Sequence, residues 1–310
     1  MLVSFVSTIL GSLLSVCITC LLAFAVTLIF RTSTTTNFAQ SSIAAFGCYT
    51  VAWLFAKGLP VWLGAPVGMI VGAAFGIFID NFIFRRGRYV GILSKQIITM
   101  GFVSVFFGAI PLIFGNPESI PFEPLYNYTK HGVSPNIVIE IAGGELVVTK
   151  HALISATITL VVLGAIFYLL KNSKWGLSVR TTASNEQTAQ LMGINTHKVT
   201  AISWALAAAL GVLSAVMYAG SGVMISATFM GAIQVNAFLA CILGGFSTFY
   251  GPIIGAIIIP VLANAVGFLA NFKGLEGIGR WQMVIVYSII LLVILIKPEG
   301  LFGKKIVKKV

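Results

Sequence analysis

The chain has 310 residues, of which 58% are hydrophobic and only 9% are charged, and its formal net charge is +11 at pH 7. Soluble domains carry roughly 25% charged residues, and a chain with so few polar side chains cannot cover a water-facing surface. Its mean hydropathy is +1.02. This composition argues against a soluble globular protein and predicts a polytopic integral membrane protein.

The apolar runs of the sequence predict the membrane spans. A helix needs about 20 apolar residues to cross a bilayer, and runs of that length recur along the whole chain. We therefore expect an all-α fold with about nine transmembrane helices, within a range of about eight to ten. The second and seventh runs are the weakest. The expected spans are 8–30, 38–57, 60–82, 96–114, 152–170, 200–219, 232–247, 252–270 and 281–297.

The basic residues predict the orientation, because Lys and Arg accumulate on the cytoplasmic side of a membrane. With the N-terminus outside, fourteen of the nineteen Lys and Arg fall in the cytoplasm. We thus expect a multi-pass protein of the cytoplasmic (inner) membrane, with the C-terminus inside and its basic tail near anionic lipid. Spread over several loops, the cations form no stripe that would bind nucleic acid. The fourteen are Arg31, Arg85, Arg86, Arg88, Lys95, Lys171, Lys174, Arg180, Lys198, Lys297, Lys304, Lys305, Lys308 and Lys309.

A long loop at 115–151 falls on the outer side in this topology. Four prolines oppose helix in its first part. Its second part, NIVIEIAGGELVVTK, contains two β-branched runs around Gly143-Gly144 and predicts a small β-hairpin. A plain connector is the alternative. Because about 37 residues is long for a connector, we favour a docking surface or a lid.

One predicted span carries a face of glycines. In GAPVGMIVGAAFG, glycine recurs at every fourth position, and residues four apart lie on one face of a helix. Glycines at that spacing let two helix backbones approach closely. The partner, either another helix of this chain or a second subunit, stays open. The four positions are Gly64, Gly68, Gly72 and Gly76.

Few polar side chains lie within the predicted spans. Buried amides can hydrogen-bond a zwitterionic solute or join helices to one another, and the second use is the commoner one. No span carries a central chain of acid and base residues, so a proton relay has no support. The candidates for a substrate path are Gln40, Gln96, Gln234, Asn236 and Asn264.

The sequence contains no set of residues that predicts catalysis. No stretch matches the phosphate loop G-x-x-x-x-G-K-[ST], and His131, His151 and His197 lack the spacing of a helical metal site. The four cysteines lie in apolar runs. Cys17 and Cys20 have the spacing of a redox pair but no supporting residues nearby, so we expect packing roles. We predict no enzyme activity, no metal and no cofactor bound by this chain.

Residues 182–195, TASNEQTAQLMGIN, are polar although they lie between two apolar spans. Ser184 and Gln187 have the spacing of an S-x-x-Q capping box, which begins a helix, and Gly193 suits the left-handed position that ends one. A helix of about two turns is therefore expected, which is too short to be stable without a partner surface. The apolar residues expected to dock onto that partner are Leu191, Met192 and Ile194.

Four segments of the chain carry a family resemblance. They are GLSVRTTASNEQTAQLMGINTHKVTAISWALAAALGVLSAVMYA (176–219), TTNFAQSSIAAFGCYTVAW (35–53), LGGFSTFYGPIIGA (243–256) and PEGLFG (298–303). In this order they resemble the coupling loop and following helix, the NFA-type segment, the glycine-rich hairpin and the terminal motif of LivH-type branched-chain amino acid permeases, which belong to ATP-binding cassette (ABC) importers. The resemblance runs from about residue 8 to residue 303.

The resemblance implies one permease domain over 1–310, with an outer loop at 115–151, a coupling loop at 171–199 and a basic tail at 298–310. It also implies an extracytoplasmic solute-binding protein, a LivM-like second permease and two ATPase subunits. These subunits would bind ATP and Mg, hold one coupling helix from each permease and drive alternating access. The implied coupling residues are Ser184, Glu186, Gln187, Ala189, Leu191, Met192, Gly193 and Ile194.

The coupling loop departs from the family pattern at one place. Such loops often carry E-A-A-x-x-x-G, and alignment on Gly193 gives Gln187-Thr188-Ala189, so that only the third position agrees. Glu186 is displaced by one residue. We therefore expect a neutral rather than an ionic docking contact at Gln187.

The alternative function is a stand-alone secondary transporter or channel for a small polar solute. It predicts a repeat with broken helices in the two halves of the chain, and the sequence contains no convincing repeat. A membrane enzyme would need a catalytic cluster, which is absent. The residues do not specify the solute, because relatives of this kind carry branched-chain amino acids, other amino acids, urea or amides.

Overall fold

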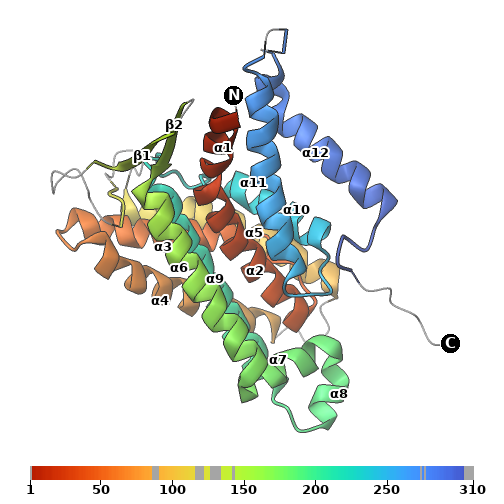
Figure 1. The fold of residues 1–310 in the computed structure, drawn as a ribbon. Coiled ribbons are helices and arrows are strands. Elements are labelled where there is room, and N and C mark those ends of the chain that lie inside the picture. The colour runs from red at the N-terminus through yellow and green to blue at the C-terminus, as the bar shows by residue number, and fades with distance from the viewer. Residues whose placement is uncertain are drawn as a thin grey trace.

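The computed structural model describes residues 2–85, 91–115, 122–125, 134–141, 144–272, 274–275 and 277–303. Helices dominate these ranges (Figure 1). They are α1 (Leu2–Leu10), α2 (Leu13–Ser33), α3 (Gln40–Ala56), α4 (Val61–Phe78), the π-helix η1 (Ile79–Phe84), α5 (Ile92–Phe114), α6 (Lys150–Asn172), α7 (Lys174–Ser184), α8 (Glu186–Leu191), α9 (Thr196–Ala219), α10 (Gly231–Gly244), α11 (Gly251–Leu269) and α12 (Ile278–Ile296), with strands β1 (Asn136–Ile141) and β2 (Gly144–Thr149) between α5 and α6.

Seven helices in the described ranges are long and apolar enough to cross a membrane. They account for seven of the nine predicted spans. The other two coincide with α3, which has 17 residues, and α10, which has 14. Both short helices follow segments that are not helical, 34–39 and 220–230; the first of these is largely buried, and Met230, directly before α10, is buried too. The count of nine full spans is therefore not confirmed.

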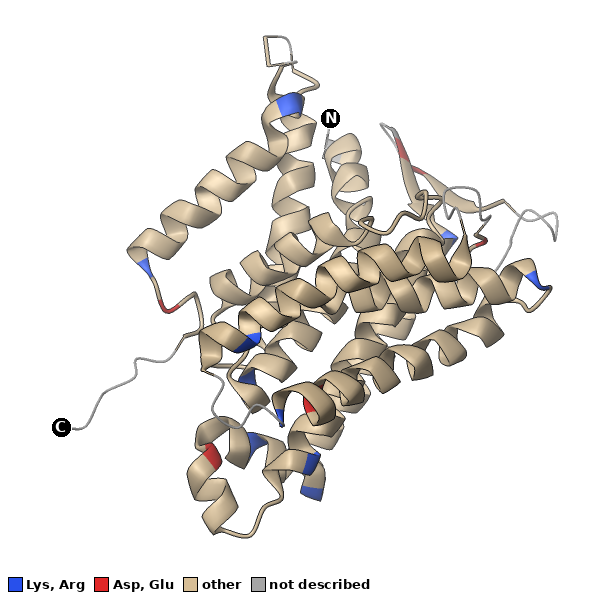
Figure 2. Cartoon of the chain, turned by 180° about the vertical axis from the view of Figure 1, so that it is seen from behind, with Lys and Arg blue, Asp and Glu red and all other residues tan. Residues whose placement is uncertain are grey.

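The polar elements lie at two opposite ends of the bundle. The N-terminus and the hairpin share one end, here called the hairpin end, while α7 and α8 project from the other, the α8 end (Figure 1). Lys and Arg gather toward the α8 end (Figure 2), as a cytoplasmic face would require. Among them, Arg31, Lys171 and Arg180 line one cavity beside α7, and Arg85 donates to the carbonyl oxygen of His197 at the start of α9.

The centre of the bundle is formed by α2 and α9, which pack against each other. They run antiparallel, since the Ser214 hydroxyl, near the end of α9, donates to the carbonyl oxygen of Ile18, near the start of α2, over 3.2 Å. Apolar side chains on both are fully buried, including Phe24 and Trp204. Helix α4 packs on α9, α6 and α11 pack on α2, and α5 and α12 lie further out, on α3 and on α10 and α11.

The glycine face of α4 packs within this chain. A Cβ on Gly64 or Gly68 would meet Val51 of α3, and one on Gly72 or Gly76 would meet α9. At Gly76 the nearest atom would be the Trp204 carbonyl oxygen, at 2.5 Å. The glycine face of α4 thus lies close to α3 and α9, and both are helices of the same subunit.

The two halves of the bundle repeat one arrangement. In the first, α3 and α4 pack on each other and α4 packs on α9; in the second, α10 and α11 pack on each other and α11 packs on α2. The corresponding central helices, α2 and α9, are antiparallel. The halves α2–α5 and α9–α12 are therefore related by inversion, a repeat that the sequence did not reveal.

The predicted hairpin is present within the 115–151 loop. Strands β1 and β2 pair antiparallel, from Asn136 opposite Thr149 to Ile141 opposite Gly144. The amide of Val147 donates to the Ser7 hydroxyl over 3.4 Å, which holds the hairpin near α1. Residues 116–121, 126–133 and 142–143 of this loop lie outside the described residues.

Candidate functional site

The short polar helix predicted near 185–192 is α8, at the end of the molecule away from the hairpin (Figure 1). Its N-cap is Asn185, whose side-chain oxygen accepts a hydrogen bond from the Thr188 amide over 3.0 Å. The capping box predicted between Ser184 and Gln187 is therefore wrong. Ser184 is the last residue of α7, and the extended backbone of Asn185 makes the corner between the two helices.

The C-terminal end of α8 closes as predicted. Gly193 has a φ of +79°, in the left-handed region. Its amide donates to the Gln190 carbonyl over 3.0 Å, and the Ile194 amide donates to the Ala189 carbonyl over 3.0 Å. These two bonds form a Schellman motif, which stops the helix and satisfies carbonyls of its last turn.

One face of α8 is anchored and the other faces outward. Ala189 is fully buried, and the Gln190 side chain donates to the Thr196 hydroxyl over 3.0 Å. Leu191 is 88% exposed and Met192 is 75% exposed. Ile194, predicted to be exposed, instead packs half-buried against the bundle, because the Schellman turn directs it back toward α9. The outward surface therefore consists of Glu186, Gln187, Leu191 and Met192.

An ion pair between the buried Asp80 and the partly exposed Arg85 lies close to the segment that follows α8. Asp80, in η1, is 3.4 Å from the Arg85 guanidinium and accepts a hydrogen bond from the Thr200 hydroxyl of α9 over 3.3 Å. Arg85 also donates to the carbonyl oxygen of His197. These contacts tie the end of α4 to the start of α9.

The two short helices begin at a shared network of amides inside the bundle. The Gln40 side chain, at the start of α3, donates to the Ala207 carbonyl over 2.7 Å and accepts from the Asn37 side chain over 3.1 Å. The Gln234 side chain, in the first turn of α10, donates to the Asn37 carbonyl over 3.2 Å. All three amides are buried, and among the described residues the Gln234 Oε1 atom has no hydrogen-bond partner. Asn37 thus holds the non-helical segment that the sequence interpretation missed.

The other three candidate path residues are partly buried and also join elements. The Gln96 side chain donates to the Thr36 hydroxyl over 2.8 Å, and the Asn264 side chain donates to the Thr8 carbonyl over 3.1 Å. The Asn236 side chain accepts from the Tyr287 hydroxyl over 2.9 Å. All five amides therefore have helix-joining contacts, and their role in a substrate path stays a prediction.

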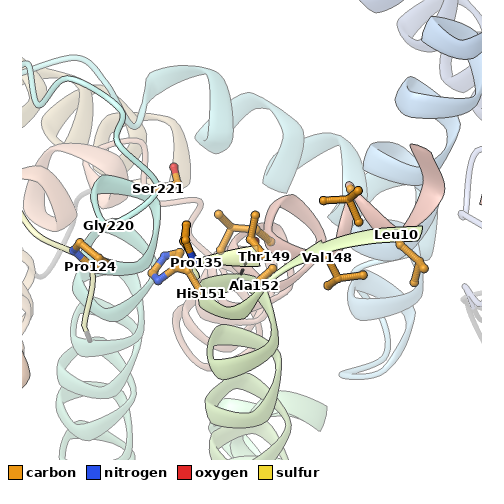
Figure 3. Close-up of a pocket in the computed structure, with 12 residues that line it drawn as sticks. Leu10, Pro124, Pro135, Val148, Thr149, His151, Ala152, Gly220 and Ser221 are labelled. Atoms are coloured by element: carbon orange, nitrogen blue, oxygen red, sulfur yellow. Dashed lines mark hydrogen bonds between the residues drawn. The ribbon is translucent and has the colours of Figure 1, made fainter. Parts of the chain in front are cut away.

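A cavity of about 340 Å³ opens at the hairpin end. Figure 3 shows its lining, which comes from the start of α6, the end of α9, strand β2 and the corner after α1. His151 is buried there, with its Nε2 atom 2.8 Å from the Met217 carbonyl oxygen. The exposed Ser221 hydroxyl donates to the Tyr218 carbonyl over 2.7 Å.

Two motifs far apart in the sequence meet at the α8 end. The Leu301 amide donates to the Leu243 carbonyl over 2.7 Å, and the Phe302 amide donates to the Gly244 carbonyl over 3.2 Å. A Cβ on Gly300 would overlap the Gly245 backbone. The PEGLFG segment thus closes the C-terminal end of α10, which explains why both segments are rich in glycine.

Within the described ranges, no group of three or more His, Cys, Asp or Glu could hold a metal ion. The four cysteines are free and buried, as expected for packing residues. The long apolar helices of this part of the chain, with polar surfaces at the two ends, define a multi-pass membrane protein.

The comparisons with known proteins place the chain within that class. The family described as "Branched-chain amino acid transport system / permease component" matches residues 8–295. The chain belongs to this family, and it is a LivH-type ABC permease. It is 25% identical to the high-affinity branched-chain amino acid transport system permease protein LivH of Salmonella typhimurium, over 88% of this chain and 87% of that protein.

Other relatives extend the similarity. The chain is 26% identical to the probable branched-chain amino acid transport permease protein LivH of Methanocaldococcus jannaschii, over 88% of this chain and 84% of that one. Among solved structures, it resembles PsaBC from Streptococcus pneumoniae in complex with Fab, with a TM-score of 0.52, 15% identity and coverage of 93% of this chain and 91% of that one. At that identity the likeness concerns the fold alone.

Proposed function

We propose that this chain is the transmembrane permease subunit of an ABC importer that moves branched-chain or related amino acids into the cell by ATP-driven alternating access. The family match and the names of the relatives support the class of solute. The α8 end faces the cytoplasm in this proposal, in agreement with its Lys and Arg side chains.

The observation that carries the proposal is the outward face of α8. Leu191 and Met192 are almost fully exposed at the tip of a six-residue helix that points away from the bundle. Apolar side chains in such a position are typical of a docking surface. We assign this surface to an ATPase subunit, which binds ATP and Mg, since the chain carries no phosphate loop of its own. A second ATPase subunit engages a LivM-like second permease.

The contacts between α8 and the bundle would transmit a displacement of α8 to other helices. Gln190 and Ile194 connect α8 to α9, and Arg85 connects the start of α9 to the end of α4. A displacement of α8 would therefore act on α9 and α4 together. Because these two helices are closely packed along the glycine face, they would move as one unit.

The hairpin end is assigned to the extracytoplasmic solute-binding protein. The hairpin exposes apolar side chains, among them Val138 at 50% and Ile139 at 54%, beside the cavity of Figure 3. A partner seated on the hairpin would remove this apolar surface from water. The five amides are retained as candidates for the solute path, and the solute is chosen largely by the binding protein.

The test replaces both exposed apolar residues, as Leu191→Ser/Met192→Ser, in the chain expressed together with its partners. We expect roughly tenfold or greater loss of solute uptake and of ATPase recovery on purification, as for a central docking contact. Met224→Ser is the matched control, because Met224 is 71% exposed in the segment that follows α9. Deleting residues 186–192 should leave the protein in the membrane and abolish both uptake and ATPase stimulation. Full uptake by either α8 variant would refute the coupling assignment.

The alternative of a stand-alone carrier needs its own experiment. The alternative predicts a repeat with broken helices, and the two halves of the bundle repeat one arrangement, so the repeat does not count against that alternative. Collapsing the membrane potential while ATP is maintained would stop a potential-driven carrier and would spare an ATP-coupled importer. Loss of uptake under that condition would favour the carrier.

A further inference from the structure

A second cavity, of about 400 Å³, lies at the α8 end of the bundle. Its walls come from the ends of α2 and α6, from α7, and from the turn between α10 and α11. Three basic residues line it, one from each of the three helices. They are Arg31, Lys171 and Arg180.

None of these cations has an ion-pair partner in the part of the chain that the structure describes. Arg31 is held in place, because it donates to the Ser247 carbonyl and its guanidinium carbon lies 4.5 Å from the centre of the Phe249 ring. Arg180 donates to the Lys171 carbonyl over 3.3 Å, which brings the last turn of α6 and the middle of α7 together. The cavity therefore gathers three positive charges that the described residues do not neutralise.

The cavity also lies at the level where apolar spans end. The span that contains α2 ends at Ser33 and α6 ends at Asn172. Phe167 lines the cavity, and the neighbouring Tyr168 is 67% exposed on α6. Tyrosine at the end of a span is typical of the membrane–water interface. An occupant at this depth meets apolar side chains on one side and cations on the other, which fits an amphiphile.

We propose that this cavity binds the anionic phosphate group of a phospholipid, with Arg31, Lys171 and Arg180 as its donors. Basic pockets between membrane helices bind anionic lipid headgroups by this chemistry. The bound headgroup links α2, α6, α7 and the α10–α11 turn. Anionic lipid thereby stabilises the base from which α8 projects. Free inorganic phosphate has the same chemistry, and the experiment separates the two sources.

The experiment measures lipid binding to the purified full-length chain by native mass spectrometry. The probe is an equimolar mixture of phosphatidylglycerol and phosphatidylcholine presented in detergent micelles, with inorganic phosphate in a separate arm. The test variant is Lys171→Gln/Arg180→Gln, since both side chains are exposed and Arg31 keeps its contacts. The control is Lys174→Gln/Lys198→Gln, which removes the same charge from exposed residues at the same end but outside the cavity.

We expect the wild type and the control to retain phosphatidylglycerol in preference to phosphatidylcholine. The test variant should bind phosphatidylglycerol about thirtyfold more weakly. Equal loss in the two variants, or no preference in the wild type, would overturn the proposal. Binding of inorganic phosphate that Lys171→Gln/Arg180→Gln abolishes, without any lipid preference, would assign the site to free phosphate and refute the lipid.

Discussion

The two halves of the bundle use one arrangement with different packing distances. At the crossing of α3 and α4, a Cβ on Gly68 would meet the Gly47 carbonyl and Val51. At the crossing of α10 and α11, a Cβ on Gly255 would meet the Ala240 carbonyl. The same contact thus recurs in the inverted half, and a glycine allows it both times.

The halves diverge further along the same face. Four and eight residues after Gly68, α4 has Gly72 and Gly76, which lie against the backbone of α9. The same steps from Gly255 lead to Ile259 and Ala263 of α11, which are buried with side chains in place. The α4–α9 contact is correspondingly more extensive than the α11–α2 contact. Because lipid is as apolar as the helix side chains, the hydrophobic effect does not hold two membrane helices together, and close backbone packing stabilises the pair instead. This difference indicates that α4 and α9 form the more rigid pair.

The largest expected effect is that of Gly76→Ala, which breaks the close pair. The new methyl group would lie 2.5 Å from the Trp204 carbonyl oxygen, and a backbone neighbour cannot turn aside. We expect the free energy of unfolding in detergent to fall by about 3 kcal/mol, the upper part of the usual range for overpacking. Gly101→Ala in α5 is the control, because a Cβ there would meet nothing within 4 Å. Equal stability of the two variants would contradict the packing interpretation.

The next prediction concerns the first turns of the two short helices, α3 and α10. Gln40→Leu removes the partner of both the Ala207 carbonyl and the Asn37 side chain, so we expect a loss of about 2 kcal/mol in stability. Gln234→Leu removes one bond and one unpaired oxygen, so a loss of about 1 kcal/mol or less is expected. Thermal unfolding and uptake are measured on the same samples. Uptake lost at unchanged stability in Gln234→Leu would place this residue on the solute path.

The starts of α3 and α10 also mark where prediction from the sequence reached its limit. Apolar runs located the seven long spans and the shorter α3 and α10, but they did not separate α1 from α2 and could not reveal that α3 and α10 begin in the interior. The backbone of Phe38 and Ala39 can be buried because Thr99 and Asn37 accept its amide hydrogens. Thr99 lies on a distant part of the chain, so a local pattern carries no sign of it. The inverted repeat was hidden for the same reason, because it consists of contacts rather than shared residues.

A smaller effect is expected in the second half of the bundle, where α11 packs on α2. Ala263→Gly gives α11 the residue that α4 has at Gly76. We expect it to lower stability by about 1 kcal/mol, because the buried methyl group of Ala263 is lost and glycine is the poorer helix former. Chemical unfolding of Ala263→Gly and of Gly76→Ala under the same conditions gives the change in the free energy of unfolding for each variant. A stabilised Ala263→Gly variant would show that α11 and α2 close up as α4 and α9 do.

The smallest effect concerns α8, which lies between the halves and has no counterpart in either. Ser184 and Asn185 are both good helix caps, so composition alone could not choose between them. In the structure only the Asn185 oxygen reaches the Thr188 amide. Asn185→Ala should therefore destabilise α8 by about 1 kcal/mol, seen as roughly fivefold faster amide hydrogen exchange over residues 186–191, while global unfolding is unchanged. Ser184→Ala should leave this exchange unaltered. The opposite ranking would restore the Ser184 cap and would mean that α7 ends one residue earlier when the chain is alone.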